Sequence, residues 1–577
     1  MKQKSMRVYL ILLLLIVAAC SVIFWKNLSY HYEMRGEQTA LSGVDMEISG
    51  YDVSAAGGGI RSFTVTGEDP QFLLTFPAEG ALDIGAIELI FEQGGEHESQ
   101  KALPVQVFYA KEGAEFKERH SVKRVLEAGR TSLVIPVPQG RYETLRFDID
   151  GDFRLAGIYS CSEPVSARAY VSQETVNACL WYFPAVIIGG CLIFWAHGER
   201  IRKGKFTKAA YAREVFLGAE PSAGREGYLD YLRVLAAVLV ILAHSCSPMV
   251  DRADAGWKRL VLVCGLSLGL CCNILYVMLS GTLLLGGRNN RDEGVVTFYV
   301  RRASKVIIPL VAYYLLLLFL NGEVSFLPPE NIGVSFLRIA AGAPDAGPHL
   351  WLIYTIVALY LVTPFFRVMV QHMGDRLLFA LAVVILVLNV LTTYLPLFGT
   401  AFGATSFLAG WEGIFLLGYI LTRQNSLQGA TRRNRILLSA AAVCYIVMAA
   451  AVFADSSNMN YVYGSTPTIT VASCGIFVLF LTNKNRFQGK VCALVRMCSK
   501  YSYSIILIHW YALFVVVQGK LHITALRFGC LGGIAASVAV TFAVCLAMAV
   551  VYDNTVVVVC SVIFDKLTAR LTKSFEE

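Results

Sequence analysis

The chain has 577 residues, of which 56% are hydrophobic and only 16% are charged, and its mean hydropathy is +0.56. This composition excludes a single soluble domain and indicates a polytopic membrane protein with a further domain attached. The net charge of +8 does not point to a nucleic-acid partner, because most basic residues flank apolar runs, as membrane topology requires.

The 15 cysteines lie mostly within apolar runs, where cysteine packs as a small hydrophobic residue. The sequence contains no CxxC pair and no Cys/His cluster at metal-ligand spacing. We therefore expect neither a disulfide framework nor a metal site.

The first 176 residues divide into an anchor and a β-domain. Residues 1–27 hold Lys2, Lys4 and Arg7 before an apolar run at 8–25, without a convincing cleavage site, so we expect a retained transmembrane anchor. Residues 28–176 alternate short hydrophobic runs with glycine and polar residues, a pattern typical of an all-β sandwich. Alternating charges at 144–150 fit a solvated strand face better than a ligand site. We expect a jelly-roll-like β-sandwich, inserted between two transmembrane helices.

The rest of the chain is predicted to be helical and embedded in the membrane. A second transmembrane helix is expected at 177–196, followed by a basic cytoplasmic linker at 197–226. Ten more apolar segments follow, and each approaches the roughly 20 residues that a spanning helix needs. They form a predicted membrane domain at 227–563, before a cytoplasmic tail at 564–577. The expected fold is thus an all-α membrane protein with about 12 spans and an extracytoplasmic β-domain. The ten segments lie at 228–250, 258–286, 303–321, 348–370, 376–396, 405–422, 434–454, 466–483, 497–518 and 527–560.

The orientation follows from the basic residues beside these segments. With the N-terminus inside, the inner segments hold 29 Lys and Arg and the short outer loops hold 6. Cytoplasmic loops carry an excess of Lys and Arg, so this asymmetry predicts that both termini are cytoplasmic. The β-domain then lies outside a plasma membrane.

The first segment of the membrane domain carries two polar residues in an otherwise apolar run. Arg233 and His244 lie eleven residues apart, which on a helix is about three turns and roughly 16 Å along one face. Ionisable residues within spans usually face a protein interior or a water-filled cavity. Arg233 alone would also fit snorkelling to the headgroups, but His244 lies too deep in the run for that. We interpret the pair as a candidate site.

Further polar motifs follow in later segments. Ser280 lies in Met278-Leu-Ser-Gly281, and Arg302 and Lys305 lie in a basic stretch that ends at Pro309. His349, Trp351 and Tyr354 lie in Gly347-Pro-His-Leu-Trp-Leu-Ile-Tyr354, and His509 ends Tyr501-Ser-Tyr-Ser-Ile-Ile-Leu-Ile-His509.

Over residues 227–560 this set of motifs resembles the acyltransferase-3 family, the ten-helix membrane O-acyltransferases that modify bacterial surface polysaccharides. The resemblance implies transfer of an acyl group, most often acetyl, from cytoplasmic acyl-CoA to a hydroxyl of a cell-envelope glycan or lipid-linked sugar. It implies no tightly bound cofactor, and its partners are the donor, the acceptor and membrane lipids, with no nucleic acid.

The resemblance also suggests roles for individual residues. His244 matches the essential histidine of the first helix, and Arg233 matches its partner arginine. Arg302 and Lys305 match a donor-binding Arg-x-x-Arg motif, although lysine lacks the bidentate fork of arginine.

Five more residues are candidates for acceptor binding or support. They are Ser280, His349, Trp351, Tyr354 and His509. The two histidines would also serve as partners for neighbouring helices, and the aromatic residues would also fit an interfacial belt.

The chemistry of these residues agrees with acyl transfer. Moving an acyl group from a thioester to an alcohol requires a base that takes the alcohol proton, and a neutral imidazole suits this task. A transporter or flippase is an alternative, since charges within spans also mark substrate pathways, but no inverted repeat is evident. A cell-wall sensor is another alternative, but no cytoplasmic output domain is evident in the sequence.

Overall fold

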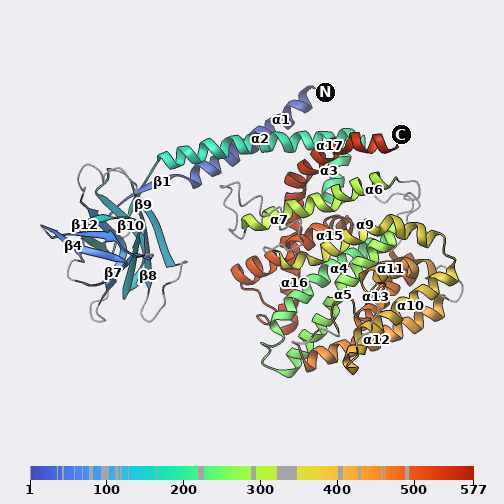
Figure 1. Ribbon diagram of the computed structural model, residues 1–577. Helices are drawn as coiled ribbons and strands as arrows, with labels where there is room; N and C mark the ends of the chain where they lie inside the picture. Colours follow the sequence, from blue (N-terminus) through green and yellow to red (C-terminus); the bar gives the residue numbers. More distant parts are fainter. Residues whose placement is uncertain are drawn as a thin grey trace. The chain divides into compact units, whose positions relative to one another are not determined.

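The computed structural model divides into two compact units, residues 1–190 and 191–577. It describes residues 2–34, 37–41, 44–57, 59–67, 69–76, 82–92, 103–110, 116, 120–127, 129–163, 165–218, 226–286, 294–320, 347–400, 407–425, 430–456, 459, 462–487 and 493–576. Each unit has its own hydrophobic core. Figure 1 labels the elements of both.

The first unit contains a β-domain between two helices, as the alternating sequence predicts. Helix α1 (Lys2–Lys26) precedes it, and α2 (Gln173–Gly204) follows it and continues into the second unit. The strands are β1 (Ser29–Glu33), β2 (Thr39–Ala40), β3 (Asp45–Ser49), β4 (Tyr51–Gly57), β5 (Ile60–Val65), β6 (Gln71–Thr75), β7 (Leu82–Phe91), β8 (Leu103–Ala110), β9 (Ser121–Leu126), β10 (Ser132–Tyr142), β11 (Thr144–Ile149), β12 (Phe153–Cys161) and β13 (Ser166–Tyr170).

The strands form two large antiparallel sheets. One sheet has the order β10-β7-β12-β5-β4, with β2 added on β12, and the other has the order β3-β6-β11-β8-β9. Strands β1 and β13 pair separately. Both large sheets contribute to one hydrophobic core, which is the arrangement of a β-sandwich.

Strand β11 shows how the sequence pattern produces this sandwich. Its buried residues alternate, so Phe147 faces the core and stacks on Phe72 with ring centroids 4.7 Å apart. Arg146 and Asp148 face the other way and form a bidentate ion pair with both contacts at 2.7 Å. These two charges therefore satisfy each other on the outer face of the strand.

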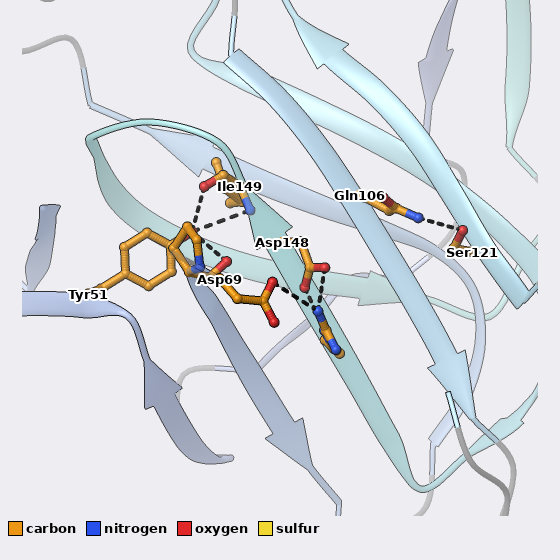
Figure 2. Close-up of polar contacts among 8 residues, drawn as sticks. Tyr51, Asp69, Gln106, Ser121, Asp148 and Ile149 are labelled. Atoms are coloured by element: carbon orange, nitrogen blue, oxygen red, sulfur yellow. Dashed lines mark hydrogen bonds and ion pairs between the residues drawn. The ribbon is translucent and has the colours of Figure 1, made fainter. Parts of the chain in front are cut away.

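Hydrogen bonds of Tyr51 join the two sheets directly. The Tyr51 hydroxyl on β4 donates to the carbonyl oxygen of Ile149 on β11 at 2.6 Å (Figure 2). Burial raises the pKa of Tyr51 to about 12, since the charged phenolate would lose its hydration.

The second unit is helical throughout its described residues. After α3 (Lys208–Leu217), the helices are α4 (Gly227–Cys246), η3 (Ser247–Met249), α5 (Gly256–Gly286), α6 (Val295–Arg302), η5 (Ala303–Ile307), α7 (Ile308–Leu320), η6 (Pro348–Leu350), α9 (Trp351–Gln371), α10 (Asp375–Tyr394), η7 (Leu395–Phe398), α11 (Trp411–Asn425), α12 (Ala430–Ala454), α13 (Pro467–Thr482), α14 (Lys484–Phe487), α15 (Ala493–Tyr511), η8 (Ala512–Lys520), α16 (Cys530–Tyr552), η9 (Asp553–Val557) and α17 (Val558–Glu576).

The helices agree with a multi-pass membrane protein. Among the described residues, nine helices are long and apolar enough to cross a membrane. They cover Thr175–Gly204, Gly227–Met249, Gly256–Gly286, Val295–Leu320, Trp351–Gln371, Asp375–Phe398, Thr431–Ala454, Ala493–Lys520 and Cys530–Ala569.

Three of the twelve expected spans are not in that group. Two are the shorter apolar helices Leu13–Lys26 and Pro467–Thr482, and the third contains α11, which has 15 residues. The first two residues of this last expected span (405–422) lie outside the described residues. The count of twelve spans and their orientation stay predictions.

Helix α5 lies at the centre of the helical unit and packs closely on α4 and α11. A Cβ atom on Gly281 would overlap the carbonyl oxygen of Phe415, and one on Gly418 would overlap that of Met278. Glycine lets two helix backbones approach without a side chain between them, which is a common packing device in membranes. Helices α4, α9, α11, α12 and α13 all contact α5, and α15 packs on α4 (Figure 1).

Candidate active site

One cavity in the helical unit is lined by three histidines that are far apart in the sequence. His244 comes from the last turn of α4, His349 from the short helix η6, and His509 from the end of α15. The cavity has a volume of about 280 Å³. Its other lining residues are mostly apolar or aromatic, and the polar ones include Ser247, Asn273, Tyr276 and Tyr463.

The three imidazole rings contact one another around His509. The ring of His244 stacks on that of His509 with centroids 5.2 Å apart, and the ring of His349 meets it edge-on at 5.0 Å. Trp510 contacts two of the histidines, since its ring lies 5.1 Å from that of His244 and 5.8 Å from that of His349. The cluster is thus one aromatic assembly built from α4, η6 and α15.

Hydrogen bonds to backbone carbonyls fix the tautomers of two of these rings. His349 Nε2 lies 3.0 Å from the carbonyl oxygen of Leu507, and His509 Nδ1 lies 2.7 Å from that of Ile506. A carbonyl oxygen only accepts, so each of these nitrogens carries the proton. In the neutral rings, His349 Nδ1 and His509 Nε2 therefore keep their lone pairs.

Neither of these lone pairs is used within the described part of the chain. His349 Nδ1 and His509 Nε2 are buried and have no hydrogen-bond partner among the described residues. A buried polar atom without a partner costs free energy, so such atoms mark places where water or a ligand binds. The two nitrogens are suited to accept hydrogen bonds from ligand hydroxyl groups.

Tyr276 adds a hydroxyl group to the same cavity. Its oxygen is buried and lacks a hydrogen-bond partner among the described residues, and it lies within electrostatic range of Arg233. Neither Tyr276 nor Trp510 was among the residues predicted from the sequence. Trp510 directly follows His509, which was the available signal, whereas nothing in the sequence distinguishes Tyr276 from other tyrosines in spans.

Arg233 lies near the start of α4 and does not line the cavity. Its guanidinium pairs with Asp230 at 3.1 Å, and Asp230 is 1% exposed and also accepts a hydrogen bond from Ser499 at 2.7 Å. The buried carboxylate thus holds Arg233 between α4 and α15. A direct role for Arg233 at the reacting atoms stays a prediction.

Arg302 and Lys305, the two residues expected to bind the donor, have different surroundings. Lys305 lies in the π-helical turn η5, and Arg302 comes just before it. Lys305 lines a second cavity together with Arg301, whereas the Arg302 guanidinium lies over the ring of Phe298 at 5.4 Å. Arg301 and Lys305 thus line one cavity, and Arg302 is not among its lining residues. The donor-binding role of Arg302 and Lys305 stays a prediction.

The remaining predicted residues are distributed differently. Trp351 lines the histidine cavity and packs against Trp411 and Tyr463, with ring centroids 5.5 and 6.3 Å apart. Ser280 and Tyr354 do not line that cavity, although both are half-buried in the neighbouring helices α5 and α9. Of the five acceptor candidates, the structure thus gathers His349, Trp351 and His509.

The cluster offers no metal-ligand geometry. Among the described residues, no group of three or more histidine, cysteine, aspartate or glutamate side chains is arranged to hold a metal ion. What the cavity does present is a set of imidazole nitrogens and hydroxyl groups, which suits proton transfer and hydrogen bonding.

Comparison with known proteins identifies the helical unit. The model of the acyltransferase-3 family, described as an acyltransferase domain, matches residues 226–552. The chain belongs to this family. The match confirms the resemblance seen in the sequence and makes the protein a membrane acyltransferase. All three histidines of the cavity lie within the matched residues, whereas α2, α3 and α17 lie outside them.

The other comparisons add little. A search of the curated proteins finds no significant match. One solved structure, of a low affinity xylan binding module from Roseburia intestinalis, is 12% identical, with a TM-score of 0.16. The similarity covers 23% of this chain and 95% of the module.

Proposed function

We propose that the protein is an O-acyltransferase that moves an acyl group, most often acetyl, from acyl-CoA to a hydroxyl group of a cell-envelope glycan. The family supports the acyl transfer, and the histidine cavity supports the hydroxyl acceptor. The observation that carries the proposal is the meeting of three imidazoles with two unused lone pairs in one small cavity.

In this mechanism His244 acts as the general base. Its ring nitrogen takes the proton of the acceptor hydroxyl as the hydroxyl oxygen attacks the thioester carbonyl. A carbon–oxygen bond forms, and the tetrahedral intermediate then collapses with cleavage of the carbon–sulfur bond. The proton on His244 passes to the departing thiolate, so the products are the ester and free CoA.

The other polar groups of the cavity position the acceptor and stabilise charge. His349 Nδ1 and His509 Nε2 accept hydrogen bonds from neighbouring sugar hydroxyls, which orients the attacking oxygen. The Tyr276 hydroxyl is a donor for the oxyanion that develops on the carbonyl. Trp510 and Trp351 supply flat apolar faces of the kind that pack against sugar rings.

The predicted topology gives the two substrates separate entrances. It places the start of α4, with Arg233, toward the cytoplasm, and the ends of α4 and α15, with His244 and His509, toward the outside. The donor then enters from the cytoplasmic side, and the glycan acceptor meets the cavity from the outer side. The β-domain is predicted on the side where the acceptor resides.

The test is acyl transfer by the purified full-length protein in nanodiscs. Acetyl-CoA is supplied with a glycan acceptor, and release of the free CoA thiol is followed together with the mass of the glycan. We expect thiol release that depends on the acceptor and a glycan that gains one acetyl group. Acetyl-CoA that stays intact in nanodiscs, together with transport of the same glycan by the protein in sealed proteoliposomes, would instead establish the transporter alternative.

A further inference from the structure

A second cavity, of about 670 Å³, lies where the ends of α2, α6 and α17 meet. Among the described residues, its lining includes four cationic side chains and one carboxylate, that of Asp565. The cations are Arg200 and Lys203 from α2, Arg301 from α6 and Lys305 from η5. We call this space the basic cavity. Its charge is strongly unbalanced, so it favours an anionic ligand.

Asp565 organises the side of the basic cavity formed by α2. Its carboxylate accepts a hydrogen bond from the Ser304 hydroxyl at 2.8 Å, and lies 3.6 Å from the Arg200 guanidinium and 3.7 Å from the Lys203 ammonium. One carboxylate thus holds two cations and a hydroxyl at the same wall.

The other lining cations of the basic cavity come from α6 and η5. Arg301 and Lys305 are four residues apart, so they share one face of the helix. Arg302 is directed to Phe298 instead. The π-helical turn at 303–307 begins between the two cavity-lining cations, and such turns are frequent at functional sites.

We propose that the basic cavity binds the phosphate groups of an anionic ligand. Guanidinium and ammonium groups are side-chain groups that bind phosphate oxygens in proteins. Two of the four cations, and Asp565, come from α2 and α17, which lie outside the family match at 226–552. The site is therefore built jointly by the acyltransferase domain and by helices that flank it.

Two sources supply this chemistry at the predicted cytoplasmic surface. One is the donor nucleotide, and this source rests on the proposed function. The other is the headgroup of an anionic phospholipid, which does not depend on acyl transfer. Both place phosphate oxygens among the same four cations, and only binding measurements separate them.

The experiment uses full-length protein in nanodiscs and three variants. The cavity variant is Arg200→Ala with Lys203→Ala, and a charge-retaining variant is Arg200→Lys with Lys203→Arg. The control variant is Lys208→Ala with Arg213→Ala, two basic residues of α3 that do not line the basic cavity. Binding of CoA is measured in one arm. Stabilisation by phosphatidylglycerol in phosphatidylcholine nanodiscs is measured in the other, as the shift in thermal unfolding midpoint.

Loss of charge-assisted contacts to phosphate is expected to weaken binding by about tenfold or more. Weaker CoA binding in the cavity variant alone assigns the nucleotide as the ligand. Loss of the phosphatidylglycerol shift in that variant alone assigns the lipid headgroup. In either case the charge-retaining variant should behave like the wild type, which separates loss of charge from loss of folding.

The proposal is overturned if CoA binding and the lipid shift are the same in the cavity variant and the wild type. It is also overturned if CoA binding or the lipid shift falls as much in the control variant as in the cavity variant. The effect would then come from general surface charge. A wild-type protein that neither binds CoA nor releases its thiol would refute the proposed donor. The phosphatidylglycerol arm would still decide whether the basic cavity binds phosphate.

Discussion

The imidazole of His244 stacks on the imidazole of His509 with centroids 5.2 Å apart and an angle of 30° between the ring planes. The two rings come from α4 and α15, and each also contacts a further aromatic ring of the same cavity. A change in either histidine therefore affects the other, and the variants below are designed to distinguish their roles.

The general-base assignment predicts a large loss of turnover in His244→Gln. Glutamine keeps hydrogen-bonding capacity but cannot take a proton, so acyl transfer should fall by the ~10²–10⁴-fold attributed to general base catalysis. Thiol release is measured at saturating acyl-CoA, and membrane levels of the variant should match the wild type. Near wild-type turnover in purified His244→Gln would show that His244 is not the general base. His509 would then be the candidate.

The positioning role of His509 predicts a different kinetic effect. In His509→Asn, the side-chain amide can still donate to the Ile506 carbonyl, but the lone pair at the Nε2 position is lost. We expect the KM for the glycan acceptor to rise by about tenfold, the effect of roughly 1.4 kcal/mol of lost binding, while kcat changes less. A fall in kcat as large as that of His244→Gln, with an unchanged KM, would argue against positioning.

The donor-binding assignment predicts that Lys305 matters more than Arg302. Replacing both with alanine should raise the KM for acyl-CoA, because one charge-assisted phosphate contact is worth about 1.5–3 kcal/mol, or roughly tenfold or more. Lys305→Ala should account for most of that rise, since Lys305 lines the basic cavity and Arg302 lies over Phe298. Equal effects of the two single variants on KM would contradict this division.

The close approach of α5 and α11 predicts that Gly281→Ala destabilises the protein. The new methyl group would overlap the carbonyl oxygen of Phe415, and overpacking of this kind costs about 1–3 kcal/mol or more. The thermal unfolding midpoint in detergent is the measurement. The matched control is Gly198→Ala on α2, where a methyl group meets open space. An unfolding midpoint for Gly281→Ala as high as that of Gly198→Ala would show that α5 and α11 leave room for a methyl group at this position.

The hydrogen bond between the two sheets predicts that Tyr51→Phe weakens the β-domain. Loss of the hydroxyl leaves the buried carbonyl of Ile149 without this partner, at a cost of about 1–3 kcal/mol. Amide hydrogen exchange of β11 in the full-length protein should become faster. Tyr159→Phe is the control, since the Tyr159 hydroxyl has no hydrogen bond among the described residues. Unchanged exchange in Tyr51→Phe would mean that apolar packing alone joins the sheets.

The charge asymmetry between inner and outer segments predicts the topology. A reporter that is active only outside the cytoplasm should work when fused after residue 120, in the β-domain. A reporter that is active only inside should work after residue 430, at the start of α12. Reversed reporter activity at either position would overturn the predicted topology.

The sequence by itself determined the two kinds of structure and the family. A spanning helix needs a long apolar run whatever it packs against, so hydropathy located most helices of the second unit. Strands buried on one face alternate by two, so Phe147 and its outward neighbours Arg146 and Asp148 were readable without a partner strand. Strands such as β4, which is rich in small residues, gave no such signal and were missed.

Only the tertiary structure decided which side chains meet. His349 precedes its helix by one short turn and His509 lies in the last turn of another, and nothing local in either segment shows that they meet each other and His244 in one cavity. Their meeting depends on helix contacts made elsewhere, such as the close approach of α5 to α4, where a Cβ atom on Gly269 would overlap the backbone of Ala243. Hydropathy is a property of one segment against its solvent. Packing is a property of two surfaces at once, which is why the spans could be read from the sequence and the cavity could not.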